Sequence, residues 1–327
     1  MGNNSAKVGV DMDISDLIRK GPPMNEGQFI LPETIKIAEG DKKAEAVVTA
    51  IAKITAIQQI RRNALIEKPD QAGIVLERGR CALHYACLNP QDVETVKLLL
   101  RVKATVDVQD IDGISPLMLA AQNDCPDTAR LLLKASADIE QRDCHGFTPL
   151  MYACANNSFA TVSVLLKEKP DVNAKSNLGQ TPLILAAAKN YSAICKSLLL
   201  AEAELDGKDG QGNTAVMVTV INRFMKTTRL LLSFDPDIDA QNNQGNTALI
   251  LAAMDNNKDM VELLLNNQAK KDLANNEGNT ALLCACDANA TETALFLIQR
   301  FADVKQQNEA KKTALMLACY HDNTEVL

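Results

Sequence analysis

Leucine-rich segments with helical spacing recur along most of this chain at a nearly constant interval. Examples are VKLLL at 96–100, ARLLL at 129–133 and VELLL at 261–265, which lie multiples of 33 residues apart. Between such segments lie shorter stretches rich in small apolar residues, such as Ala120-Ala121 and Ala186-Ala187. Two kinds of apolar segment in each period of this length predict a stacked-repeat protein.

Polar and conformationally special residues recur with the same period and mark where the helices begin and end. A Thr suits the N-cap of the shorter helix because its hydroxyl accepts from an unpaired backbone N–H; it stands at Thr148, Thr181, Thr214, Thr247, Thr280 and Thr313. An Asn near the helix end tolerates the left-handed conformation, at Asn157, Asn190, Asn256 and Asn289. A Gly in the preceding turn supplies a positive φ, at Gly113, Gly146, Gly179, Gly212, Gly245 and Gly278. Each period therefore predicts a turn and two antiparallel helices, which must stack to bury their apolar faces.

With TPL at 148–150 and 181–183 followed by the LLL segments, these units resemble ankyrin repeats. The resemblance covers residues 76–327 and implies an all-α ankyrin-repeat solenoid of helix-turn-helix units with β-hairpin-like turns. We number its repeats one to eight, near 76–109, 110–142, 143–175, 176–208, 209–241, 242–274, 275–307 and 308–327, the last incomplete.

Two departures from the family pattern carry structural expectations. The His that often follows TPL in the family is present only as His84, which puts the usual inter-turn hydrogen bonds of that residue in doubt elsewhere. Repeat five has Thr219-Val220 where the family has two Ala, so we expect looser packing or an altered stacking angle there.

The first 75 residues differ from the repeats. Residues 1–42 combine Pro and Gly without helical periodicity, which predicts an irregular, flexible segment. Residues 43–75 contain a helical apolar stripe and a connection, and a helix that caps the first repeat is favoured over a partner site. The Met-Gly start resembles a myristoylation signal at Gly2, but Ala6 stands where that pattern has Ser or Thr, so an unmodified start is favoured. A single acyl chain would in any case attach the protein to a membrane only marginally.

The cysteines suggest chemistry that their repeat positions argue against. Cys144, His145 and Cys154 lie close together in DCHGFTPLMYACANN, but a turn tip and a helix interior do not converge on one ion. Paired ligand spacings such as C-x2-C are absent, so we predict no metal site. Four cysteines share one position that holds Ala in other repeats, which predicts small buried residues: Cys87, Cys154, Cys286 and Cys319.

Composition excludes several functional classes. The sequence has three His and no recognised catalytic motif, so we predict no enzymatic activity and no cofactor. A net charge of −7 and 3% aromatic residues disfavour nucleic-acid binding. No apolar run is long enough to span a membrane. The chain shows no signal peptide and its cysteine count is odd, so we expect a reducing, cytoplasmic location, with peripheral membrane or cytoskeletal association as alternatives.

A protein partner is the remaining expectation, and the turn tips indicate where it would bind. In ankyrin-like stacks the turn tips and the first, inner helices form a concave face. Exposed apolar residues rimmed by polar ones often mark an interface. We therefore predict a protein-binding surface centred on the turn tips of repeats two to four, with Ile111, Ile114, His145, Phe147 and Leu178, and including Arg78 and Arg80 of repeat one. Packing of these residues against neighbouring tips is the alternative.

The sequence favours a non-enzymatic scaffold or adaptor over two other roles. One is a regulatory repeat array of a larger enzyme or channel that continues beyond residue 327. The other is a structural subunit of a large assembly, for example a cytoskeletal one. Both would account for a final repeat that stops before its second helix.

Overall fold

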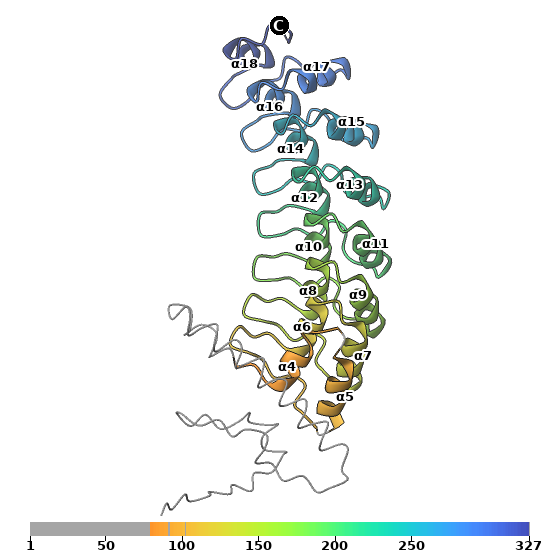
Figure 1. Cartoon of the computed structure of the whole chain (residues 1–327). Coiled ribbons are helices and arrows are strands. Elements are labelled where there is room, and N and C mark those ends of the chain that lie inside the picture. The colour runs from red at the N-terminus through yellow and green to blue at the C-terminus, as the bar shows by residue number, and fades with distance from the viewer. Residues whose placement is uncertain (1–78, 91, 102, 327) are drawn as a thin grey trace, which may run out of the picture. The chain divides into compact units, whose positions relative to one another are not determined.

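The structure is a computed structural model that describes residues 79–326 except residues 91 and 102 (Figure 1). The predicted irregular segment, the predicted capping helix, Gly2 and Arg78 lie outside the described residues. The chain divides between Cys144 and His145 into two compact units, each of which is described by itself.

The N-terminal unit contains two repeats, each with an inner and an outer helix. The first pair is α4 (Ala82–Ala86) and α5 (Val93–Arg101), and the second is α6 (Pro116–Gln122) and α7 (Pro126–Lys134). The inner helices pack against each other, as do the outer helices, which is the stacking that the repeat pattern predicts.

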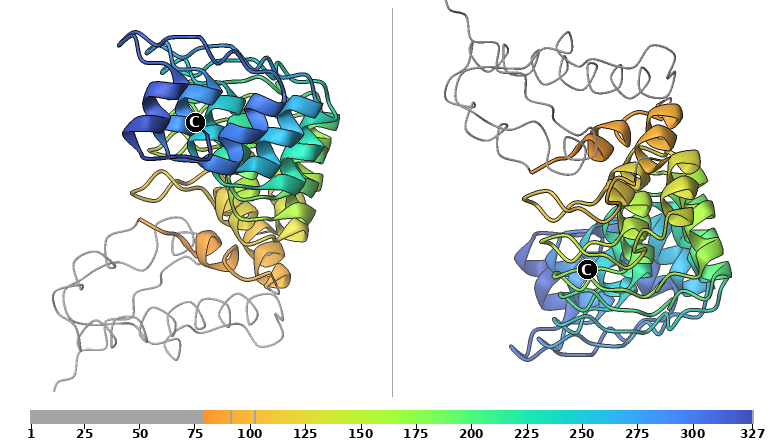
Figure 2. Two further views of the ribbon diagram at one scale, coloured as in Figure 1. Left: turned by 90° about the horizontal axis from the view of Figure 1, so that it is seen from above. Right: turned by 90° about the horizontal axis from the view of Figure 1, so that it is seen from below.

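The C-terminal unit continues the pattern through repeats three to eight. Its inner helices are α8 (Pro149–Ala155), α10 (Pro182–Ala188), α12 (Ala215–Ile221), α14 (Ala248–Met254), α16 (Ala281–Asp287) and α18 (Ala314–Tyr320). Its outer helices are α9 (Phe159–Leu165, extended by the 3-10 turn η3, Leu166–Glu168), α11 (Ser192–Leu200), α13 (Met225–Leu232), α15 (Lys258–Asn266) and α17 (Thr291–Gln299). Within this unit the two kinds of helix form separate columns, and the turns between repeats project as fingers on the side of the inner helices (Figure 1). The end-on views in Figure 2 show the same separation of fingers and helices.

The described residues contain helices and turns but no β-strand, which confirms the predicted all-α solenoid. Each finger is closed by its own backbone hydrogen bond, for example from Asn242 N to Asn246 O at 3.0 Å. A further backbone bond joins it to the next finger, as from Asn276 N to Gln244 O at 3.1 Å. The fingers are therefore hairpin-like turns that share very few backbone hydrogen bonds.

The predicted helix caps are confirmed. The hydroxyl oxygen of Thr247 accepts from the backbone N–H of Ile250 at 3.3 Å, and Thr148 accepts from Met151 at 3.4 Å. The same bond recurs in every inner helix of the C-terminal unit. Asn157 and Asn190 adopt the left-handed conformation that ends an inner helix, with φ of 59° and 61°.

The finger glycines serve close approach as well as backbone geometry. Gly245 has φ +77°, and a Cβ added there would lie only 2.6 Å from the backbone nitrogen of Asn276 in the next finger. At Gly79 φ is +60°, but the nearest atom to an added Cβ, Ile111 N, is 3.6 Å away. Position 245 therefore needs Gly both for its positive φ and for the close approach of the next finger, whereas position 79 needs it for its φ alone.

The bulky pair in repeat five is accommodated inside the helix packing. Thr219 and Val220 are 0% and 1% exposed. The Thr219 hydroxyl donates to Val216 O at 2.8 Å, and the hydroxyl of Thr228 on α13 lies 2.9 Å from Thr219 Oγ1. A polar pair thus joins the inner and outer helices of this repeat, and looser packing there stays a prediction.

Candidate functional site

The finger residues of the N-terminal unit differ in how far they reach solvent. The side chain of Ile111 is 61% exposed, whereas Ile114 is half-buried. Arg80 Nε lies 2.8 Å from Asp110 Oδ2, and their side chains are 10% and 0% exposed. Arg80 therefore joins repeats one and two internally, and Ile111 is the predicted interface residue that this unit presents most openly.

His84 shows what the family His does in this chain. It is fully buried, and its Nε2 lies 2.9 Å from Ile114 O in the next repeat. Because a carbonyl only accepts, Nε2 carries the proton, and Nδ1 then accepts from Cys81 N at 3.1 Å. Burial, the largest cause, lowers the pKa of His84 and favours this neutral ring. His84 thus has a structural role between two repeats.

In the C-terminal unit the predicted finger residues also separate into packed and exposed ones. Phe147 is half-buried against Met151, Ala174 and Leu185, and its ring meets the Tyr152 ring edge-on at 5.7 Å. Phe147 is therefore half-buried, where the sequence predicted an exposed turn tip.

Leu178 and His145 are the members of the predicted surface that this unit exposes. The side chain of Leu178 is 70% exposed at the tip of its finger, and His145 is exposed on the preceding finger. The two fingers are joined by the backbone bond from Asn177 N to His145 O at 2.9 Å. The structure therefore places these two residues on neighbouring, linked fingers.

The amide-rich fingers of repeats five to eight are bonded to one another. Asn275 Nδ2 donates to Asn246 Oδ1 at 2.9 Å, and the same bond joins Asn242 to Asn213 and Asn308 to Asn279. Asn246 is 3% exposed. The recurrence of Asn at two fixed positions of these repeats was the observation in the sequence that indicated a ladder.

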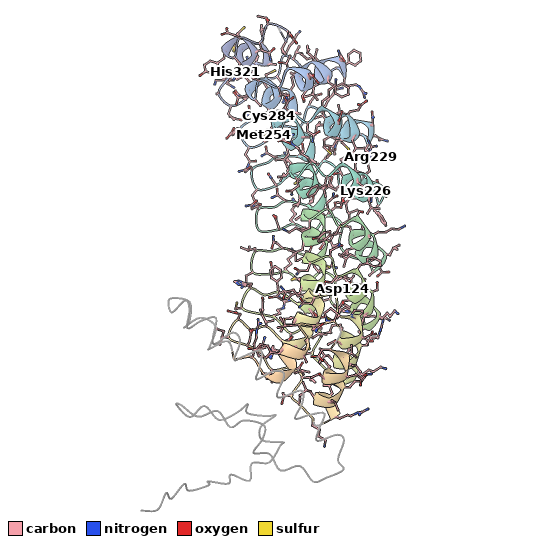
Figure 3. The ribbon with its side chains drawn as sticks, viewed as in Figure 1. Asp124, Lys226, Arg229, Met254, Cys284 and His321 are labelled. Carbon is pink, nitrogen blue, oxygen red and sulfur yellow. The ribbon has the colours of Figure 1, made fainter. Side chains whose placement is uncertain are left out.

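Sequence reasoning also missed two exposed apolar residues on the inner helices. Ile221 and Met254 end α12 and α14 and are 47% and 50% exposed. The corresponding residues in earlier repeats are Ala155 and Ala188, so the increase in size along this position was the available indication. Met254 and the buried Cys284 are labelled on the neighbouring helices α14 and α16 in Figure 3.

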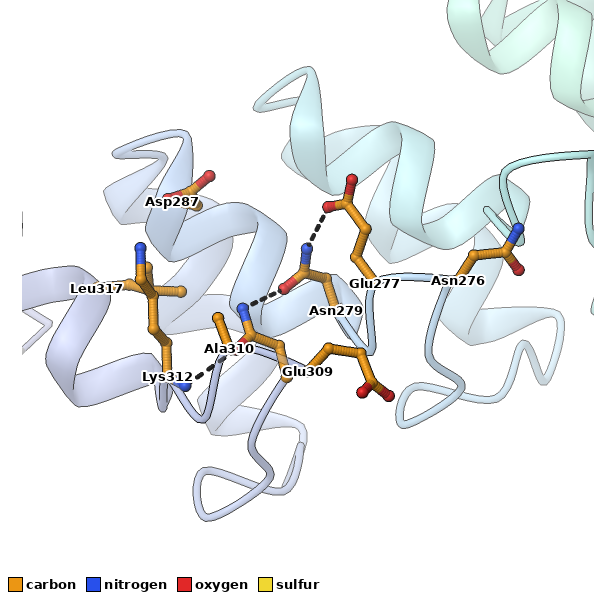
Figure 4. Close-up of a pocket in the computed structure, with 9 residues that line it drawn as sticks. Asn276, Glu277, Asn279, Asp287, Glu309, Ala310, Lys312 and Leu317 are labelled. Carbon is orange, nitrogen blue, oxygen red and sulfur yellow. Dashed lines mark hydrogen bonds between the residues drawn. The ribbon is translucent and has the colours of Figure 1, made fainter.

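A cavity of about 480 Å³ lies between the fingers and inner helices of repeats seven and eight (Figure 4). Its charged lining consists of Glu277, Asp287, Glu309 and Lys312, three carboxylates against one ammonium group. Buried Leu317 contributes an apolar wall. The arrangement favours a cationic group over an anionic one.

The buried cysteines behave as the shared repeat position predicts, with one correction. Cys87, Cys154 and Cys286 are fully buried, but Cys319 is exposed. Residues at this position are covered by the inner helix of the following repeat, and no such helix follows α18 in the described residues.

Two further properties of the described residues bear on function. No group of three or more His, Cys, Asp or Glu side chains in that part of the chain is placed to hold a metal ion. None of the helices described there combines the length and the apolar character needed to cross a membrane.

Comparison with known proteins identifies the repeats. A family model described as ankyrin repeats, which contains three copies, matches residues 58–143, 83–176, 140–209, 183–275, 217–308 and 267–327. These overlapping matches cover residues 58–327. No curated protein matches the chain.

Proposed function

Because the chain belongs to the ankyrin repeat family, whose repeats form protein–protein interaction modules, we propose that it is a non-enzymatic scaffold or adaptor that binds a protein through its fingers. The binding residues are Ile111 on the N-terminal unit and Leu178 with His145 on the C-terminal unit. Ile114, Phe147 and Arg80 support the fingers from within.

The exposure of Leu178 is the observation that carries the proposal. A Leu that is 70% exposed at a finger tip loses hydrophobic stabilisation unless another surface covers it. Its finger is fixed on both sides, by Asn177 N to His145 O and by Gly210 N to Leu178 O, each 2.9 Å. An apolar side chain on a preorganised backbone suits the central contact of an interface, because little ordering entropy is lost on binding.

The thiols support a non-enzymatic role in a reducing compartment. None of the nine cysteines forms a disulfide. Burial raises the pKa of the Cys195 and Cys284 thiols to about 12, so neither supplies a thiolate nucleophile at neutral pH. Free thiols in this number are typical of the cytoplasm, which we propose as the location.

The test compares two leucines of equal exposure. Leu200 ends the outer helix α11 and, like Leu178, is 70% exposed, so Leu200→Ser is a matched control for Leu178→Ser. Wild-type and variant chains are used for affinity capture from native lysate with quantitative mass spectrometry, and the Kd of each captured partner is then measured. We expect Leu178→Ser to weaken binding at least ~10-fold and Leu200→Ser to leave it unchanged. Equal binding by the two variants would refute the finger interface.

A further inference from the structure

Ile221 and Met254 form an apolar pair on neighbouring repeats of the C-terminal unit. Both are the last residue of an inner helix, and they lie 33 residues apart in sequence. About half of each side chain is exposed, whereas Val218, one turn earlier in α12, is 9% exposed. The helices α12 and α14 pack against each other, so the two side chains are separated by about one interhelical distance, roughly 10 Å.

A salt bridge holds the same two repeats in place beside this pair. Arg223 Nε lies 2.6 Å from Asp255 Oδ2, and Arg223 Nη2 lies 2.7 Å from Asp255 Oδ1 and 2.9 Å from the Asp255 carbonyl. Such a bidentate contact fixes the orientation of the Arg223 guanidinium relative to the Asp255 carboxylate and also pairs their charges. The apolar pair is therefore presented on a fixed support, and the charge of Asp255 is neutralised next to it.

The next position in this row is Asp287, where the surface becomes anionic. Asp287 ends α16, lies 33 residues after Met254 and lines the 480 Å³ cavity with Glu277 and Glu309. Among the described residues no Lys or Arg nitrogen lies within 4.0 Å of the carboxylates of Glu277, Asp287 or Glu309, and His321 Nε2 lies 3.9 Å from Asp287 Oδ1. Glu277 accepts from the neutral amide of Asn279 at 3.1 Å, which leaves its charge in place.

We propose that repeats five to eight bind a peptide segment of a partner protein that presents apolar side chains followed by a Lys or Arg. The apolar side chains cover Ile221 and Met254, and the cation enters the cavity where the three carboxylates of Glu277, Asp287 and Glu309 outnumber the one ammonium group of Lys312. This inference rests on the proposed protein-binding function but uses residues other than Leu178. The change from the apolar pair to the anionic cavity is what specifies the ligand, because it matches the two kinds of side chain in a fixed order.

The spacing between repeats sets the spacing within the ligand. A polyproline II segment advances about 3.1 Å per residue with three residues per turn, so side chains three residues apart share a face and reach adjacent repeats. A helix advances about 1.5 Å per residue, which makes that separation about seven residues. The spacing of apolar and basic residues in a bound sequence therefore identifies its conformation.

A random 20-residue peptide library displayed on phage, selected against the complete 327-residue chain, provides the probe. We expect enriched peptides to contain apolar residues and a Lys or Arg at a regular spacing of three or seven. A synthetic peptide of the enriched sequence is then titrated by fluorescence anisotropy at low and high salt. Its affinity should fall at high salt because the cavity contact is ionic. Enriched peptides without basic residues, or an affinity indifferent to salt, would overturn the proposal.

Two variants assign the binding to this surface. Ile221→Ser with Met254→Ser, and separately Glu277→Gln with Glu309→Gln, should each raise the Kd at least ~10-fold. All four side chains are exposed, so folding is preserved, which thermal unfolding verifies.

Leu200→Ser and Leu178→Ser should bind the peptide like the wild type. If Leu178→Ser alone abolishes binding, the peptide occupies the finger surface and this inference fails while the proposed function stands. If Leu178→Ser loses partner capture but still binds the peptide, the finger surface and the peptide-binding surface are distinct.

Discussion

Asn275 and Asn246 are joined across two fingers by a side-chain hydrogen bond of 2.9 Å, from Nδ2 of the first to Oδ1 of the second. Asn246 also donates to Gln244 Oε1 at 3.1 Å, and its backbone N–H donates to Asn242 Oδ1 at 3.0 Å. The amide therefore connects fingers that share few backbone bonds. Because Asn246 is buried, we expect it to contribute to stability.

Replacing Asn246 by Ala should lower the free energy of unfolding by about 1–2 kcal/mol, because Asn275 then loses its acceptor in a buried site. Urea denaturation followed by circular dichroism measures the effect. Gln307→Ala removes an exposed amide from the entry to the last finger and is the control, with an expected change below about 0.5 kcal/mol. Equal stability of the two variants would show that the ladder contributes nothing.

Gly245→Ala should destabilise the protein more than Gly79→Ala. Both glycines have positive φ, which costs an Ala about 1 kcal/mol. At Gly245 the added Cβ also lies 2.6 Å from Asn276 N, and such overpacking adds about 1–3 kcal/mol. Thermal unfolding of both variants tests the difference. Equal losses would mean that adjacent fingers move apart without cost.

Phe147→Ala should destabilise the fold by about 1.5–3 kcal/mol, since a partly buried ring loses its packing on Met151, Ala174 and Leu185. Leu178→Ser, at an exposed tip, should change stability by less than about 0.5 kcal/mol. Denaturant titration of both variants checks these values. A neutral Phe147→Ala would restore Phe147 as a candidate contact with the partner.

Amide hydrogen exchange should be faster in α12 than in α14. The Thr219 hydroxyl bonds back to Val216 O within its own helix, and Thr and Val have lower helix propensity than Ala. Both effects favour local opening, which hydrogen–deuterium exchange with mass spectrometry resolves over 215–221 and 248–254. Slower exchange in α12 would show that the contact of Thr219 with Thr228 outweighs these effects.

Alkaline pH should destabilise the protein partly through Cys195. Burial raises the pKa of its thiol to about 12 in the folded protein, whereas an unfolded thiol ionises near ~8.5. The unfolded state therefore loses its proton first, so this contribution is complete below about pH 8.5 and falls by up to ~1.4 kcal/mol per pH unit as the pH rises toward 12.

Cys195→Ala tests this contribution, because Ala129 and Ala294 already occupy the same position in other repeats. The difference in unfolding free energy between wild type and variant should change between pH 8 and pH 10 as the thiol of the unfolded chain ionises. A parallel pH profile for wild type and Cys195→Ala would contradict the effect of burial.

The architecture was predictable from the sequence because it depends on local, repeated rules. Thr247 caps its helix through a bond three residues away, and Asn190 adopts the left-handed conformation at a helix end. Neither requires knowledge of distant residues. Repetition at 33-residue intervals then makes stacking the way to bury the apolar faces.

The surface was harder to predict because exposure is decided by neighbours in space. Phe147 and Leu178 are both large apolar residues near finger tips, yet one packs on Leu185 and the other reaches solvent. The sequence shows that Ile221 and Met254 stand where repeats three and four have Ala, but only the stacked repeats bring Asp287, Glu277 and Glu309 together in one cavity near them. Local periodicity determined which elements form, whereas the distance between adjacent repeats decided which side chains are buried, because each repeat is covered by the next.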